Sequence, residues 1–168
     1  FGEVSPSGKL PVTFYHNEAL AEMPDFTDYS MANRTYRYYT GKPLYPFGYG
    51  LTYGDVAVTG LTADRTCAQV TVKNTGRATE DVVQLYIKDT ASADAPTNPI
   101  LCGFQRVALA EGEEKTVTVP IEPKAFTVIN DEGQRLPGSG SWKLYAGLGQ
   151  PDARTAELTG KTALSVDL

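Results

Sequence analysis

Several residue types are scarce in this sequence of 168 residues, and their scarcity excludes whole classes of site. It contains one histidine, His16, and two cysteines, Cys67 and Cys102. A structural zinc site needs three or four Cys, His or acidic ligands, so this set is too small and too scattered to supply one. No Ser, Cys or acidic residue is arranged around His16 in the sequence in a pattern that would indicate a catalytic triad. We therefore expect no metal and no other cofactor.

Positive charge is also in short supply. The chain has 15 Lys and Arg against 20 Asp and Glu, which gives a net charge of -5. The basic residues form no run or stripe between aromatic residues, so we do not expect nucleic acid as a partner. No apolar run approaches the ~20 residues that a transmembrane helix needs, and we expect no membrane role. The opening residues 1–6 are typical of the middle of a loop, which indicates a piece of a longer protein.

Two cysteines are too few for a fold built on disulfides, and they leave either one bridge or two free thiols. Cys67 directly precedes Ala68, whose side chain we assign to an inward face, so Cys67 should face outward. Cys102 follows a long loop that spans residues 89–99. Nothing in this arrangement brings the two Cβ atoms together, and we expect free thiols.

What the chain does contain, from about Asp55 onward, is a series of short alternating segments separated by Gly, Pro, Asn and Asp. This pattern predicts an all-β fold, an immunoglobulin-like sandwich of about seven strands. The expected strands cover residues 56–61, 68–72, 83–87, a segment from residue 100, 117–121, 125–129 and 142–146. Gly103 interrupts the alternation of the fourth segment and predicts a β-bulge or a close backbone approach.

Alternation also assigns the faces of these strands. Side chains at every second position should point into the core, and the positions between them, such as Gln84 and Tyr86, should form a largely polar outer face. The strands should therefore be half-buried. The predicted core comprises Ala68, Val70, Val72, Val83, Leu85, Ile87, Val117, Val119, Ile121, Trp142, Leu144 and Ala146.

Residues 1–54 differ from the rest, since they are rich in Pro, Gly, Tyr and Phe and show no clear period of 2 or 3.6. They predict an irregular N-terminal arm. A disordered tail is normally poor in aromatic residues, so this arm should pack against something. We expect residues 36–53 to lie against the sandwich, with Phe47 and at least two tyrosines buried there, and the first half of the arm to be less firmly held.

The arm also has the densest group of candidate site residues. Aromatic faces can stack on sugar rings, and Arg can stack or pair with carboxylates, but the same side chains also suit packing between two domains. We favour the domain interface over sugar contact. The candidates for either role are Arg34, Tyr36, Arg37, Tyr38, Tyr39, Phe47 and Tyr49.

Several motifs in the chain resemble one family of enzymes. The sequences of residues 7–14, 33–39 and 43–53, in this order and spacing, are similar to the tail of the second domain of family 3 glycoside hydrolases. Residues 72–76, 83–86 and 103–107, with Leu109 and Gly112 beyond them, resemble the fibronectin type III-like domain that ends many β-glucosidases and β-xylosidases of that family. The resemblance implies a linker arm over residues 1–54 and a fibronectin type III-like domain over residues 55–168.

The same resemblance implies a parent enzyme that has a barrel domain and an α/β sandwich domain. Such enzymes cleave terminal β-linked sugars with retention of configuration, using an Asp on the barrel and a Glu on the second domain. Both carboxylates belong to motifs that lie upstream of residues 7–11, so we expect no catalytic residue in this chain. The acidic residues that are present lie in turns: Asp25, Asp28, Glu113, Glu114, Asp131 and Glu132.

The hypothesis that follows is a non-catalytic accessory domain that braces the catalytic domains of the parent glycosidase. One alternative is a carbohydrate-binding module for a β-linked saccharide, which three or more coplanar exposed aromatic rings would favour. Another is a module that binds a further protein, which would need a large uncovered apolar patch.

Overall fold

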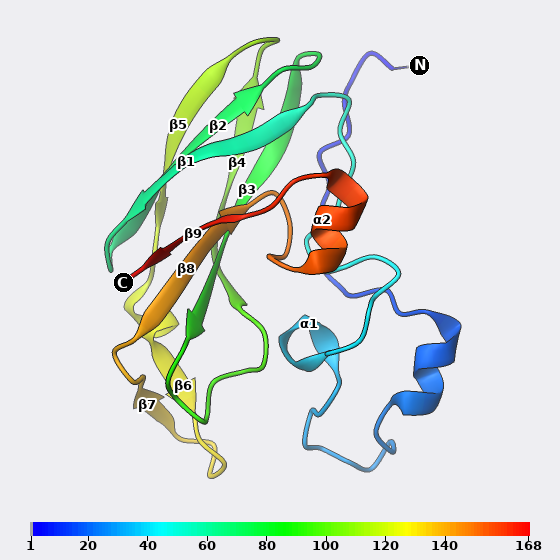
Figure 1. The fold of residues 1–168 in the computed structure, drawn as a ribbon, viewed down its shortest axis with the longest axis vertical. Helices are drawn as coiled ribbons and strands as arrows, with labels where there is room; N and C mark the ends of the chain where they lie inside the picture. Colours follow the sequence, from blue (N-terminus) through cyan, green and yellow to red (C-terminus); the bar gives the residue numbers. More distant parts are fainter. Residues whose placement is uncertain (1) are drawn as a thin grey trace.

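The computed structural model describes residues 2–168, and a β-sandwich forms most of it (Figure 1). One sheet has the strand order β1-β2-β5, and the facing sheet has the order β4-β3-β8-β9. All strand pairs are antiparallel. The predicted all-β sandwich is therefore confirmed. The strands of the two sheets are β1 (Val56–Ala63), β2 (Cys67–Asn74), β5 (Glu114–Pro120), β3 (Thr79–Asp89), β4 (Ile100–Leu109), β8 (Trp142–Gly147) and β9 (Leu164–Asp167).

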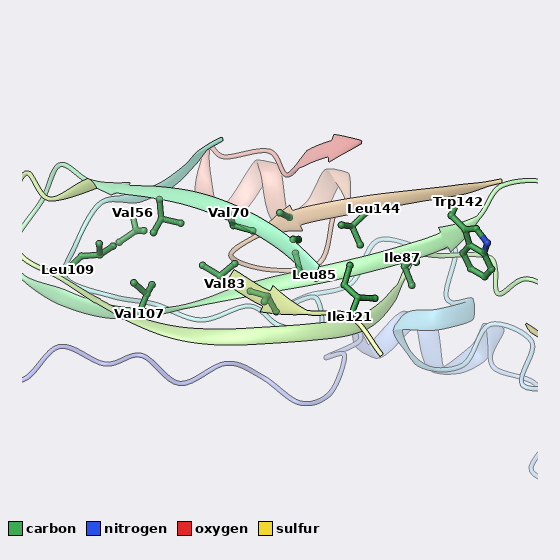
Figure 2. Close-up of a cluster of buried hydrophobic side chains, with 14 of the residues drawn as sticks. Val56, Val70, Val83, Leu85, Ile87, Val107, Leu109, Ile121, Trp142 and Leu144 are labelled. Carbon is green, nitrogen blue, oxygen red and sulfur yellow. The ribbon is translucent and has the colours of Figure 1, made fainter. Parts of the chain in front are cut away.

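Alternation along the strands builds the core between the two sheets. On β2, Ala68, Val70 and Val72 are fully buried, whereas Gln69 between them is exposed and Thr71 is half-buried. Figure 2 shows the buried cluster, with Trp142 at one end. All the predicted core residues are buried except Val117, which is half-buried and packs against the cluster. Burial of a large apolar side chain stabilises a fold by roughly 1.5–3 kcal/mol, so this cluster is the main source of stability in the sandwich.

Strand β3 departs from the prediction that it is half-buried. Its inward residues Val83, Leu85 and Ile87 are buried as expected. On its opposite face, however, Gln84 is only 3% exposed and Tyr86 is 0% exposed. The reason is tertiary: the N-terminal arm covers the outer face of this strand, so β3 is buried on both sides.

The predicted bulge at Gly103 is confirmed. Leu85 pairs with Gly103 but the next residue, Tyr86, pairs with Leu101, which leaves Cys102 as the extra residue of β4. A side chain at Gly103 would approach Val119 of the other sheet to 3.0 Å. Cys102 and Cys67 are free thiols, and burial raises the pKa of the Cys102 thiol to about 12.

Other short elements were not predicted. Residues 125–129, expected as one strand, are divided between a 3₁₀ helix, η2 (Pro123–Phe126), and β6 (Thr127–Ile129), which pairs with β7 (Arg135–Pro137). Helix α2 (Ala153–Thr159) begins where the Asp152 carboxylate accepts a hydrogen bond from the Thr155 N–H at 2.6 Å, and it ends at Gly160 with φ 69°. Left-handed backbone of this kind favours glycine after a helix.

The arm folds back on itself beside the sandwich (Figure 1). The N–H groups of Leu10 and Phe14 donate to the carbonyls of Tyr49 and Tyr45, both at 2.9 Å. Between these two segments lie η1 (Asn17–Glu22) and α1 (Thr35–Tyr38), so the arm is less irregular than predicted. No helix in the described part of the chain is long and apolar enough to cross a bilayer.

Candidate functional site

The junction between the arm and the sandwich is organised around Gln84 on the outer face of β3. Its Nε2 donates to the carbonyl of Gly48 in the arm at 2.9 Å and to that of Leu148 at 3.0 Å. Its Oε1 accepts from the hydroxyl of Tyr86 at 2.7 Å. Gly48 has φ 75°, and any side chain there would collide with the Gln84 amide. A buried amide is tolerated only when it is hydrogen-bonded, so Gln84 fixes the arm at this point.

Three aromatic rings pack beside that amide. Tyr36 and Phe47 of the arm are stacked with a centroid distance of 4.1 Å, and both meet the ring of Tyr86 edge-on at 6.3 and 6.4 Å. The Tyr36 hydroxyl accepts a hydrogen bond from the N–H of Leu101 at 3.0 Å. Burial raises the pKa of the Tyr86 hydroxyl. The arrangement gives apolar contact at the ring faces and keeps the hydroxyls paired, as interface tyrosines generally are.

Asn98, in the loop between β3 and β4, holds the short helix α1. Its side-chain Nδ2 donates to the carbonyls of Tyr36 at 2.9 Å and Tyr39 at 2.8 Å. Its backbone N–H donates to the carbonyl of Arg37 at 2.9 Å. Helix ends leave carbonyls without partners inside the helix, and one loop residue satisfies three of them here.

Charged groups complete the junction. Lys9 Nζ lies 2.6 Å from Oδ1 of Asp81 on β3. Farther along, Lys42 Nζ lies 2.7 Å from Oε2 of Glu157 on α2, and the Arg154 side chain donates to the carbonyl of Leu44. Lys9 therefore ties the start of the arm to the sandwich, while residues 20–32 are mostly exposed, as expected for a first half that is less firmly held.

The structure brings several of the predicted site residues into this junction. Tyr36 and Phe47 stack there, and the guanidinium of Arg37 lies 5.9 Å from the centre of the Tyr36 ring. Tyr39 is buried and meets the ring of Tyr15 edge-on at 4.8 Å. The predicted burial was too extensive, however: Phe47 is only half-buried, and Tyr39 is the one buried tyrosine in residues 36–53.

The remaining candidates lie in other parts of the arm. Tyr49 is half-buried and stacks on Tyr45 at 5.3 Å. Arg34 donates from Nη2 to two carbonyls of the arm itself, those of Pro24 and Asp25. Tyr38 is half-buried on helix α1. Their assignment to an interface or to a sugar remains a prediction.

Sequence reasoning missed the sandwich side of the junction, above all Gln84, Asp81 and Asn98. Gln84 alternates with apolar residues on β3, a pattern that is also typical of side chains facing water, and Asp81 follows the charged residue Glu80 near the start of that strand. Asn98 lies in a loop without periodicity. One indication of this junction was present in the sequence: the aromatic residues of the arm predicted that it packs against another surface.

The carboxyl groups do not resemble a glycosidase pair. An acid catalyst of this kind needs a raised pKa. Every carboxyl group of residues 2–168 whose pKa departs clearly from its ordinary value is lowered instead. Hydrogen bonds from Thr27 and Ser30 lower the pKa values of Asp25 and Asp28, as expected for turns. The described residues also bring together no group of three or more His, Cys, Asp or Glu that could hold a metal.

The fold and the junction define a sandwich of the fibronectin type III class with a docked arm, and comparison with known proteins agrees. Residues 81–149 match the family described as "Fibronectin type III-like domain". Residues 1–53 match the family described as "Glycosyl hydrolase family 3 C-terminal domain". The chain belongs to glycoside hydrolase family 3, and it is similar to the C-terminal region of β-glucosidases and β-xylosidases of that family.

Individual relatives support this assignment. The thermostable β-glucosidase B of Acetivibrio thermocellus is 38% identical over 152 residues, covering 79% of this chain and 20% of the relative. The xylan 1,4-β-xylosidase of Xylanibacter ruminicola is 34% identical, covering 95% and 19%. The crystal structure of a β-glucosidase from Streptomyces venezuelae in complex with D-glucose aligns with a TM-score of 0.77 and 30% identity, covering 99% and 23%. The chain spans about a fifth of the length of these curated relatives.

Proposed function

We propose that this chain is a non-catalytic accessory region of a family 3 glycoside hydrolase that cleaves terminal β-linked sugars, and that it braces the catalytic domains. Residues 1–54 would be the tail of the preceding α/β sandwich domain, and residues 55–168 the fibronectin type III-like domain. The observation that carries the proposal is that the arm is anchored to the sandwich on one side only. One side is anchored on β3, and the other side presents large apolar side chains with nothing over them.

The uncovered side comprises η1, which contains Leu20, and the segment between η1 and α1. Phe26 is 89% exposed, Tyr29 is 88% exposed and Leu20 is 67% exposed. A large apolar side chain left in water costs roughly 1.5–3 kcal/mol relative to burial, so such a group favours a partner. The preceding part of the same enzyme is the partner we propose, because this segment falls within the match to the family 3 C-terminal domain. Arg34, Tyr36, Arg37, Tyr38, Tyr39, Phe47 and Tyr49 would then be interface residues rather than sugar contacts.

Backbone conformation in the same segment supports the proposal. Met31, Asn33 and Thr35 all have left-handed φ angles, at 61°, 56° and 56°. Such positions cost of order 1–3 kcal/mol each and persist where the surroundings fix them. Within the chain, the Arg34 guanidinium and a hydrogen bond from the Thr35 N–H to the Tyr15 hydroxyl at 2.9 Å help to hold this backbone. Contact with the catalytic domains would supply the rest.

The alternative of a carbohydrate-binding module is less well supported. A flat sugar platform needs ring faces that are open to solvent. Here Tyr36 stacks on Phe47 and Tyr45 stacks on Tyr49, so each ring covers a face of its neighbour. Phe14 and Tyr45 are 46% and 39% exposed, but their planes differ by 75°. These rings do not form the coplanar set that a saccharide surface requires.

A chimera tests the bracing role. The matching C-terminal region of the Acetivibrio thermocellus β-glucosidase would be replaced by this chain, and the melting temperature and hydrolysis of an aryl β-glucoside would be measured. We expect an active chimera and no hydrolysis by the chain alone. Exchange of Phe26 and Tyr29 for Ser should lower the melting temperature of the chimera but not that of the isolated chain.

Ile129→Ser provides the matched control, since Ile129 is 44% exposed on β6, outside the arm. It should affect the chimera and the isolated chain equally. If the Phe26 and Tyr29 substitutions leave the chimera unchanged, the proposed contact with the catalytic domains is wrong.

A further inference from the structure

Strand β4 presents one large ring to solvent on the outer face of the four-stranded sheet. Phe104 is 66% exposed, and within residues 2–168 it is the only exposed large apolar side chain on the strands of the two facing sheets. It lies directly opposite Gln84, the residue that fixes the arm. Phe104 therefore borders the arm on the sandwich side of the junction.

The β-bulge in β4 turns this ring outward. Leu101 pairs with Tyr86 and shares its outer face. Strict alternation from Leu101 would put residue 104, three positions further on, on the inward face. The extra residue, Cys102, reverses the alternation, so Phe104 pairs with Gln84 and lies on the outer face. Bulges often re-aim a side chain in this way at functional positions, and this one exposes a ring that an unbroken strand would bury.

The exposed apolar side chains are also unevenly distributed over the described residues. Ten of the thirteen large ones belong to the arm, and the other three are Phe104, Ile129 on β6 and Leu136 on β7. The sheet β1-β2-β5 exposes none of them, and its outer face carries polar side chains such as Gln69 and Thr118. A single exposed ring needs no explanation, but a ring that extends a larger apolar surface indicates a partner. That partner should lie on the side of the arm and leave the three-stranded sheet in water.

We infer that the preceding part of the same enzyme contacts the sandwich directly, with an apolar surface packed on the ring of Phe104. The inference rests on the proposed bracing role and extends it, because the arm would then not be the only link between the sandwich and the catalytic domains. Continuity with the junction at Gln84 favours this occupant. In the curated relatives the matched region is only about a fifth of the protein, which leaves a large body to border the arm. Buried aromatic side chains carry much of the binding energy at such interfaces.

Hydroxyl-radical footprinting read by mass spectrometry tests this contact in the isolated chain and in the chimera described above. Phe104 should be oxidised readily in the isolated chain, because most of its ring is exposed. In the chimera its oxidation should fall several-fold, whereas Ile129 should be oxidised equally in both proteins. The fall should not depend on the concentration of the chimera. Protection that appears only at high concentration would mean that a second copy covers Phe104, and it would overturn the inference.

A substitution provides a second measurement. Phe104→Thr removes the ring and keeps a residue that favours β-strands. It should lower the melting temperature of the chimera by several degrees and leave that of the isolated chain nearly unchanged. Ile129→Thr, the matched control on β6, should act alike in the two proteins. Equal effects of Phe104→Thr on both proteins would contradict the direct contact.

Footprinting also separates this inference from the bracing role. Protection of Phe26 and Tyr29 in the chimera without protection of Phe104 would leave the bracing role intact and overturn the direct contact with the sandwich. If all three side chains are oxidised as in the isolated chain, both proposals are wrong.

Discussion

Lys9 of the arm and Asp81 of strand β3 form an ion pair across the junction, with Nζ and Oδ1 2.6 Å apart. Their side chains are 13% and 3% exposed, so the pair is largely withdrawn from water. Removal of one partner from a buried pair leaves an uncompensated charge, which costs about 3–5 kcal/mol. We expect Asp81→Ala to lower the free energy of unfolding by an amount near the lower end of that range, because Lys9 retains some contact with water.

A double substitution separates the pair from the packing around it. Lys9→Met combined with Asp81→Leu removes both charges and keeps the volume, so it should recover most of the stability lost in Asp81→Ala. Urea unfolding of the four proteins in the cycle provides the measurement. A loss in the double variant that equals the sum of the losses in Lys9→Met and Asp81→Leu would show that the charges do not interact.

The Gln84 amide makes a second testable link. Gln84→Met leaves the carbonyls of Gly48 and Leu148 without their donor, so we expect a loss of about 1–3 kcal/mol. In a chain of this size, each kcal/mol of lost stability lowers the melting temperature by about 2–4 °C. Gln69→Met, at an exposed position of β2, is the control and should change the melting temperature little. If the two variants melt together, the arm does not depend on Gln84.

The core assignment predicts a contrast between neighbours on β5. Val119 is 0% exposed, whereas Thr118 beside it is exposed. Val119→Asp buries a carboxylate without a partner, and we expect the chain to be unfolded at ambient temperature. Thr118→Asp should remain folded. Circular dichroism of the two variants checks this, and a cooperative transition in Val119→Asp near that of the parent would contradict it.

The loss of folding stability at acid pH should depend on Asp89, at the end of β3. Burial alone would raise the pKa of this carboxyl, but hydrogen bonds from the hydroxyl and N–H of Ser139 and from the N–H groups of Ala91 and Ser92 outweigh it, and the pKa lies below its ordinary value of 3.8. A lowered folded-state pKa gives stability that is present above pH 3.8 and is lost as the pH falls through the folded value.

Asp89→Asn should therefore be less stable than the parent at pH 7, and the difference should shrink as the pH falls below about 3.8. Asp131→Asn, in an exposed turn, should follow the parent at every pH. Thermal melts between pH 7 and pH 2.5 provide the measurement. A difference between Asp89→Asn and the parent that stays constant across this range would refute the assignment.

The sandwich could be predicted from the sequence because period-2 alternation indicates which side of a strand faces the core. It could not reveal that β3 is buried on both faces. Gln84 and Tyr86 alternate with apolar residues as solvent-facing side chains do, and only the docking of the arm decides otherwise. Helix α2 was missed because seven residues give too little periodicity to register.

The aromatic site was recognised in part for a related reason. The abundance of rings in residues 34–49 indicated a surface to be covered, but not which side chains would meet it. The partner Asn98 comes from a loop, where sequence carries little positional information. Phe47 was expected to be buried and is half-buried, although its ring stacks on Tyr36 and meets the ring of Tyr86 edge-on.

The hydrogen bonds from the Arg154 guanidinium to the Leu44 carbonyl have a consequence for how the chain folds during synthesis. Arg154 lies 110 residues after Leu44 in the sequence, so the arm leaves the ribosome long before the helix that holds it. At the usual synthesis rate of about 5–20 residues per second, the delay is about 5–20 s. During this interval the arm's aromatic side chains are without part of their docking surface. The arm therefore reaches its final position only after helix α2 has been synthesised, and nascent-chain chaperones should encounter it in an open state.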